Sequence, residues 1–134
     1  MKVVLDIETD GFNPSKIHCI VVKDIDTNTV TVWDSGNMYG FKNWAKGVDT
    51  FIMHNGLSFD APVLNRLLDA EILPGNIVDT LILSQLFNPI REKGHSLKAW
   101  GEKLNMLKGG EGVNFSKYNQ AMLVLKEKIL RQQR

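Results

Sequence analysis

Apolar residues recur along this chain with two different spacings, which separate predicted strands from predicted helices. Short apolar runs predict strands at 3–8, 17–23, 29–33 and 50–53, with a stub at 77–78. Apolar residues three and four positions apart predict helices at 39–47, 59–70, 79–86, 96–104 and 116–131. Three strands joined only by turns, followed by strands that alternate with helices, indicate a mixed α/β sheet: an antiparallel meander plus parallel strands, flanked by helices.

Two carboxylates stand at the end of the first predicted strand. Asp6 and Glu8 follow the apolar residues 3–5 and are separated by Ile7. Side chains two positions apart on a strand point to the same face, so we expect Asp6 and Glu8 to converge while Ile7 faces the core. Paired oxygen ligands of this kind suit Mg²⁺ or Mn²⁺. A plain strand end entering the Asp10-Gly11 turn is the alternative, and this segment alone does not decide between them.

A second acidic position, Asp60, lies where a strand gives way to a helix. The segment 54–60 reads His-Asn-Gly-Leu-Ser-Phe-Asp. Asp60 could be a plain helix cap, since acids are favoured at helix N-termini. Ser58 would cap equally well, however, and an amide-rich turn between strand and helix is also suited to contact a phosphate or a sugar.

The size of the chain and its distribution of charge narrow the choice of function. The 134 residues, of which 43% are hydrophobic, suit a single domain over 1–134. Residues 1–90 carry six Lys/Arg against eleven Asp/Glu, whereas residues 91–134 carry ten against four. An acidic part that could hold cations joined to a basic part that could hold an anion suits a metal-dependent enzyme acting on phosphate esters. A solvated, lysine-rich helical tail is the alternative explanation.

The chain shows no sign of export or of a membrane span. The single cysteine, Cys19, excludes a disulfide framework and a cysteine zinc cluster. No apolar run approaches the ~20 residues that a spanning helix needs, and the N-terminus does not read as a signal peptide. We therefore expect a cytoplasmic protein, in the cytoplasm of the host cell if the chain is viral.

Taken together, these segments resemble the DEDD family of 3′–5′ exonucleases, whose fold is ribonuclease H-like. The resemblance is closest to the proofreading domain of bacteriophage family A DNA polymerases. Residues 6–9 match the first motif of the family and residues 54–60 match the second. Linking segments at 17–24, 79–81 and 94–101 also match, so that the likeness runs from residue 3 to about residue 105.

The resemblance implies a two-metal site. Asp6 would bridge two divalent cations, Mg²⁺ or Mn²⁺, while Glu8 would bind one of them and Asp60 would support the other. Such a pair of cations hydrolyses the terminal phosphodiester by in-line attack of water. Removing the acid by Asp6→Ala is expected to abolish metal binding and to leave folding intact or slightly improved, because repulsion among the carboxylates is relieved.

The resemblance also implies a single-stranded nucleic-acid 3′ end as partner, DNA before RNA, and a DNA polymerase as a second partner. Thr9 would lie near the terminal nucleotide and Asn55 near the substrate strand. Phe12 and Tyr118 are candidates for stacking on the end base. In the basic part of the chain, Lys98 and Lys103 are candidates for phosphate contacts.

The third motif of the family, Tyr-x-x-x-Asp, is incomplete. Tyr118 stands where the motif should begin, as the residue that would orient the attacking water, but Met122 replaces the acid four residues later. No aspartate follows Asp79, and Glu127 falls on the opposite side of the helix from Tyr118. The last part of the domain, about 106–134, is therefore expected to be truncated or rearranged.

Three functions follow from this sequence. The first is a metal-dependent 3′–5′ exonuclease acting on single-stranded DNA ends, of the proofreading type used in DNA replication. The second is a catalytically impaired nucleic-acid-binding module, or a fragment that needs a partner to supply the fourth carboxylate. The third, ranked below both, is a ribonuclease H-like structural domain without a nucleic-acid role.

Overall fold

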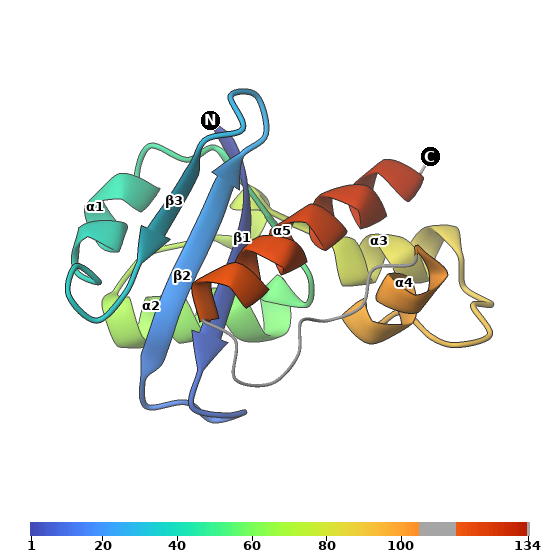
Figure 1. The fold of residues 1–134 in the computed structure, drawn as a ribbon, viewed down its shortest axis with the longest axis horizontal. Coiled ribbons are helices and arrows are strands. Elements are labelled where there is room, and N and C mark those ends of the chain that lie inside the picture. The colour runs from blue at the N-terminus through green and yellow to red at the C-terminus, as the bar shows by residue number, and fades with distance from the viewer. Residues whose placement is uncertain (105–114, 134) are drawn as a thin grey trace.

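The computed structural model describes residues 1–104 and 115–133, and for residues 115–119 the backbone alone. It contains a five-stranded mixed sheet in the order β3-β2-β1-β4-β5 (Figure 1). The strands are β1 Lys2–Thr9, β2 Ile17–Asp24, β3 Val30–Trp33, β4 Thr50–Met53 and β5 Ile77–Asp79. The strands β1, β2 and β3 form an antiparallel meander, and β4 pairs in parallel with both β1 and β5. The mixed sheet predicted from the sequence is confirmed.

The two faces of the sheet are covered by different helices. On β1, the odd-numbered Val3, Leu5 and Ile7 belong to the larger core cluster, which packs beneath α1 Gly40–Ala45 and α2 Ala61–Leu68. The even-numbered Val4 belongs to a smaller cluster with Leu123 of α5 Phe115–Gln132. Figure 1 shows α5 crossing β2 and β1 on one face while α2 lies behind them. The strand's alternation therefore directs Asp6 toward α5.

The remaining helices lie beside the sheet. They are α3 Thr80–Phe87 and α4 Leu97–Lys103, capped by the side chains of Asp79 and Ser96. Trp100 of α4 is completely buried against α5, in a cluster with Met122, Leu125 and Ile129. Among the described residues, no helix is long and apolar enough to cross a membrane.

Two short elements differ from the sequence prediction. The predicted helix at 59–70 is preceded by a wide turn of π-helix, Gly56–Asp60, and ends earlier, at Leu68. A single 3₁₀ turn, Pro74–Asn76, leads into β5. The wide turn changes where Asp60 points, because an extra residue in a helical turn rotates every side chain that follows it.

Candidate nucleic-acid end-binding site

Asp6 is the buried acid of β1. Asp6 lies opposite Val21 of β2, and only 7% of Asp6 is exposed to solvent. Its neighbour Ile7 is buried in the core on the other face of the sheet. The pairing of β1 with β4 ends at Val4, so that the chain leaving β4 can turn beside the segment that carries Asp6.

The turn after β4 is held by Asp79. The backbone N–H groups of Asn55 and Leu57 donate to the Asp79 carboxylate at 2.8 and 3.1 Å, and that of Leu81 donates to it at 3.0 Å. Asn55 takes a left-handed conformation (φ 63°), and a Cβ on Gly56 would overlap the Met53 side chain. Asp79 therefore caps α3 and also fixes the turn that leads to Asp60.

Asp60 is not a plain helix cap. It occupies the N-cap position of α2, but its side chain makes no capping hydrogen bond. The residue is 6% exposed and approaches the same cation as Asp6. The wide turn places this carboxylate toward the α5 side of the sheet.

That cation is Lys126 of α5. Its Nζ donates to Asp6 Oδ1 at 2.7 Å and to the carbonyl oxygen of Leu5 at 2.9 Å, and it lies 4.0 Å from Asp60 Oδ2. The residue is 1% exposed. The structure therefore brings together Asp6 and Asp60, two of the acids predicted to bind metal, and it places between them a lysine from the last helix.

Charge balance explains the ionisation of this cluster. Burial alone would lower the pKa of Lys126, but the carboxylates of Asp6 and Asp60 outweigh burial and hold the pKa above its ordinary value. Burial raises the pKa of Asp60 to about 7, even though the charge of Lys126 acts in the opposite direction. One ammonium thus compensates one buried carboxylate, and the second carboxyl retains its proton up to about neutral pH.

His54 and His95 connect the turn to α3 and α4. The two ring nitrogens of His54 form hydrogen bonds of 2.8 Å, one with the Thr80 hydroxyl and one with the carbonyl oxygen of His95. The ring of His95 lies 2.6 Å from the Ser84 hydroxyl, which also accepts from the Trp100 indole at 2.9 Å. Both histidines are therefore held by hydrogen bonds within the fold.

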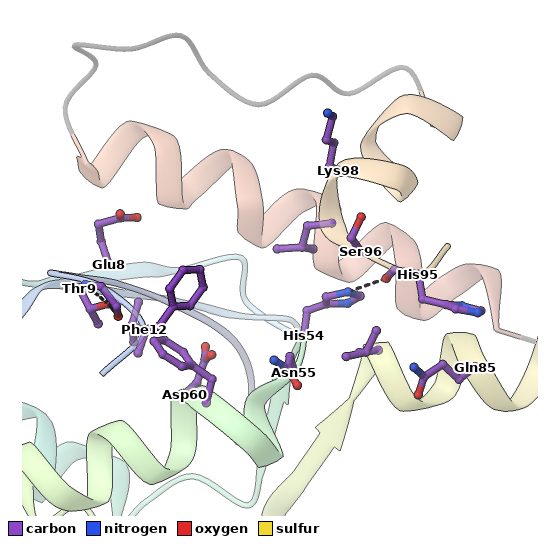
Figure 2. Close-up of a pocket in the computed structure, with 15 residues that line it drawn as sticks. Glu8, Thr9, Phe12, His54, Asn55, Asp60, Gln85, His95, Ser96 and Lys98 are labelled. Atoms are coloured by element: carbon purple, nitrogen blue, oxygen red, sulfur yellow. Dashed lines mark hydrogen bonds between the residues drawn. The ribbon is translucent and has the colours of Figure 1, made fainter. Parts of the chain in front are cut away.

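A pocket of about 760 Å³ opens beside this cluster. Its lining includes Glu8, Thr9, Phe12, Asn55, Phe59, Asp60, His95, Ser96 and Lys98. In Figure 2, Phe12 and Asp60 lie on one side of the pocket, and Ser96 and Lys98 lie on the other. Phe12 is fully exposed, whereas the Thr9 hydroxyl donates to the Gly11 carbonyl at 3.0 Å. The pocket therefore gathers most of the substrate-binding residues expected from the sequence.

Other expected site residues are not brought there. Lys103 lies in a separate depression with Arg91 and Glu92, and its ammonium is 5.0 Å from the centre of the Trp100 ring. Tyr118 lies in α5, where the structure describes its backbone and not its side chain. Most of the linker before α5, residues 105–114, is also outside them.

The residues around the end of the third motif make other contacts than metal binding. Met122 packs in the apolar cluster of Trp100, as its helical spacing with Leu125 and Ile129 predicts. Glu127 accepts from Lys23 of β2 at 2.8 Å, which confirms that it does not replace the missing acid. Lys126, one turn beyond Met122, reaches Asp6 from α5.

The described residues do not fit the two divalent cations that the resemblance implies, although exonucleases of this class use such ions. Within residues 1–104 and 120–133, no group of three or more His, Cys, Asp or Glu side chains is arranged to hold a metal ion. One of the two Asp6 carboxylate oxygens, Oδ1, already accepts from Lys126. A monovalent ammonium occupies the position between the acids.

A sequence signal for Lys126 does exist. In the last helix, the buried positions Met122, Leu123, Leu125 and Ile129 form an apolar stripe, and Lys126 falls within it. A lysine at a core position needs a buried anion. The sequence thus contains a lysine in the apolar stripe and no aspartate after Asp79, but the partner of that lysine is seen only when the helix lies beside β1.

Comparisons with known proteins agree with this architecture. No protein-family model matches the chain. Over 137 residues the chain is 28% identical to the DNA-directed DNA polymerase of Escherichia phage T7, which covers 80% of this chain and 19% of the polymerase. The chain therefore spans about a fifth of the length of that relative.

Two solved structures show the same fold. Brucella melitensis NrnC bound to pGG superposes with a TM-score of 0.68 at 21% identity, covering 98% of this chain and 72% of NrnC. Exonuclease X in complex with 5′ overhanging duplex DNA gives a TM-score of 0.57 at 19% identity, covering 98% and 92% of the two chains. The chain thus has the ribonuclease H-like fold of DEDD 3′–5′ exonucleases and is distantly similar to phage DNA polymerases, as the sequence predicts.

Proposed function

We propose that this chain binds the 3′ end of a single-stranded nucleic acid, DNA in preference to RNA, in the pocket beside Asp60. The proposal rests on two residues that face each other across that pocket. Phe12 presents a fully exposed ring on one wall, and Lys98 lies on the opposite wall. A ring that contributes nothing to packing offers a platform for an unstacked base, and a lysine across from it can contact the adjoining phosphate.

The rest of the pocket suits the same ligand. Thr9 and Asn55 supply polar groups between the two walls. The two solved structures with the same fold hold nucleic-acid ligands: NrnC is bound to pGG, and Exonuclease X is in complex with duplex DNA. The likeness to a phage DNA polymerase supports a polymerase as the partner that presents the strand end.

Metal-dependent 3′–5′ hydrolysis of single-stranded DNA, as in proofreading, is the second candidate. Asp6 and Asp60 both lie close to the ammonium of Lys126, and this convergence of two acids favours hydrolysis. It would require two Mg²⁺ or Mn²⁺ ions at acids that already have a cationic partner. We therefore rank binding of a strand end above its hydrolysis.

Binding to a single strand should depend on Phe12 and Lys98. For a fluorescent oligodeoxynucleotide with a free 3′ end, Phe12→Ala is expected to weaken binding about 5- to 150-fold, since stacking on an aromatic ring contributes about 1–3 kcal/mol per base. Lys98→Ala should reduce the slope of log K against log salt by about one. Fluorescence anisotropy at several salt concentrations, in EDTA, measures both.

The control is Lys46→Ala, which removes an exposed lysine at the end of α1, outside the pocket. An RNA strand of the same sequence tests the preference for DNA. Gel analysis of the same oligonucleotide with Mn²⁺ detects any hydrolysis. Wild-type affinity in both Phe12→Ala and Lys98→Ala would refute the proposed pocket, and turnover with Mn²⁺ would place hydrolysis first.

A further inference from the structure

Lys126 has the surroundings of a bound cation rather than those of a surface lysine. Two oxygens accept from its Nζ, Asp6 Oδ1 at 2.7 Å and Leu5 O at 2.9 Å, and Asp60 Oδ2 lies at 4.0 Å. These three oxygens come from the backbone of Leu5 and from the two acids. With 1% of the residue exposed, water does not take their place.

The packing of α5 on the sheet holds this side chain in place. Leu123, one turn before Lys126, packs on the sheet with Val4 and Val21. Glu127, the next residue, pairs with Lys23 of β2 at 2.8 Å and with Arg131 at 3.1 Å. Because contacts on both sides of Lys126 fix the rotation of the helix, the ammonium cannot leave Asp6 unless α5 shifts or the side chain takes another rotamer.

We infer that Lys126 is a built-in cation that takes the place of a divalent metal ion in this acidic site. A metal ion held between Asp6 and Asp60 would lie close to the place that Nζ takes beside Asp6 Oδ1 and Asp60 Oδ2, and it would meet a positive charge there. Metal–oxygen bonds of about 2.0–2.6 Å leave no room for an ammonium between the ion and these acids. The chain should therefore have no high-affinity site for Mg²⁺ or Mn²⁺ at Asp6.

This inference goes beyond the proposed function and does not depend on it, because it concerns the free protein. On the wall of the neighbouring pocket, Lys98 supplies a positive charge that the protein itself carries. A strand end bound there would need no divalent ion. Binding of metal and binding of nucleic acid can be measured separately, so that either proposal can fail alone.

Titration with Mn²⁺ alone tests the inference. Wild-type protein should show no saturable binding by calorimetry or electron paramagnetic resonance, and its melting temperature should not change. Lys126→Met should acquire a Mn²⁺ site, and a hundredfold excess of Mn²⁺ over its Kd should raise its melting temperature by roughly 5–10 °C. Lys128→Met, which removes an exposed lysine from the same helix, is the matched control and should behave as wild type.

A second variant keeps the test decisive if Lys126→Met folds poorly. Lys126→Met/Asp6→Asn replaces the ion pair by two neutral side chains and should fold without metal, insensitive to Mn²⁺. A Lys126→Met protein that folds only with Mn²⁺ supports the inference. Saturable Mn²⁺ binding to wild type that is lost in Asp60→Asn overturns it, as does a folded Lys126→Met protein that gains no affinity.

Discussion

Asp6→Asn is expected to lower the free energy of unfolding by about 3–5 kcal/mol, because it leaves the ammonium of Lys126 buried without its partner charge. Lys126→Met should cost a similar amount, since it leaves a buried carboxylate. The double variant should lie much closer to wild type, because neutral residues do not carry the cost of desolvating an ion pair. Urea denaturation of the four proteins at pH 7 gives the coupling energy directly.

The matched control is an exposed ion pair of nearly the same length. Lys42 and Asp69 are 2.8 Å apart, against 2.7 Å for Lys126 and Asp6, but their side chains are 37% and 77% exposed. Neutralising Lys42 or Asp69 should therefore leave the free energy of unfolding close to that of wild type, since water screens such pairs. If Asp6→Asn were equally mild, Lys126 would not be a buried partner of Asp6.

This expectation reverses the one drawn from the sequence for Asp6. Neighbouring carboxylates alone predict that loss of Asp6 relieves repulsion and leaves folding intact. With Lys126 between the acids, loss of Asp6 instead removes the stronger attraction. The sign of the effect depends on one side chain 120 positions away, which no local pattern places beside Asp6.

The sequence predicts the sheet well because its evidence is local. Alternation in 3–8 places Asp6 on one face and Ile7 on the other, and the buried clusters confirm it. Spacing in the last helix likewise predicts that Met122, Leu125 and Ile129 are core residues. In both cases, the period of the element decides which residues share a face.

Periodicity does not predict how a helix is rotated against a distant strand. The sequence comparison centres on Tyr118 and Met122, whereas Lys126 is hydrogen-bonded to Leu5 and Asp6 of β1. The π-helical turn before α2 is not predicted from the sequence for a related reason. It depends on the close approach of Gly56 to Met53 and on the hydrogen bonds of Asp79, which are tertiary contacts.

Two buried groups should make opposite contributions to the stability of the fold between about pH 4 and pH 7. Burial raises the pKa of Asp60 from 3.8 to about 7. Across that interval the folded state holds a proton that the unfolded state has released, so stability falls as the pH rises. The full loss, above the folded pKa, is about 4 kcal/mol at 1.36 kcal/mol per pKa unit.

His54 acts in the other direction. Burial lowers its pKa from 6.5 to about 4, with a further contribution from the charge of Lys126. The unfolded state then binds a proton that the folded state does not, so stability falls as the pH drops below about 6.5. The loss reaches about 3 kcal/mol once the pH is below the folded pKa. The wild-type protein should therefore change little in stability over this range.

Single variants should expose the two opposing slopes. Asp60→Asn removes the acid, so its stability should rise steeply from pH 4 to pH 6.5, driven by His54. His54→Gln loses the bonds to Thr80 and His95 and is destabilised at every pH, but its stability should fall steeply from pH 4 to pH 7. The charged neighbours of these two residues, Asp6, Asp79, Lys126 and His95, remain in both variants. Urea denaturation at half-unit steps of pH measures the slopes, and parallel profiles for Asp60→Asn and wild type would show that Asp60 ionises in the folded protein as readily as in the unfolded chain.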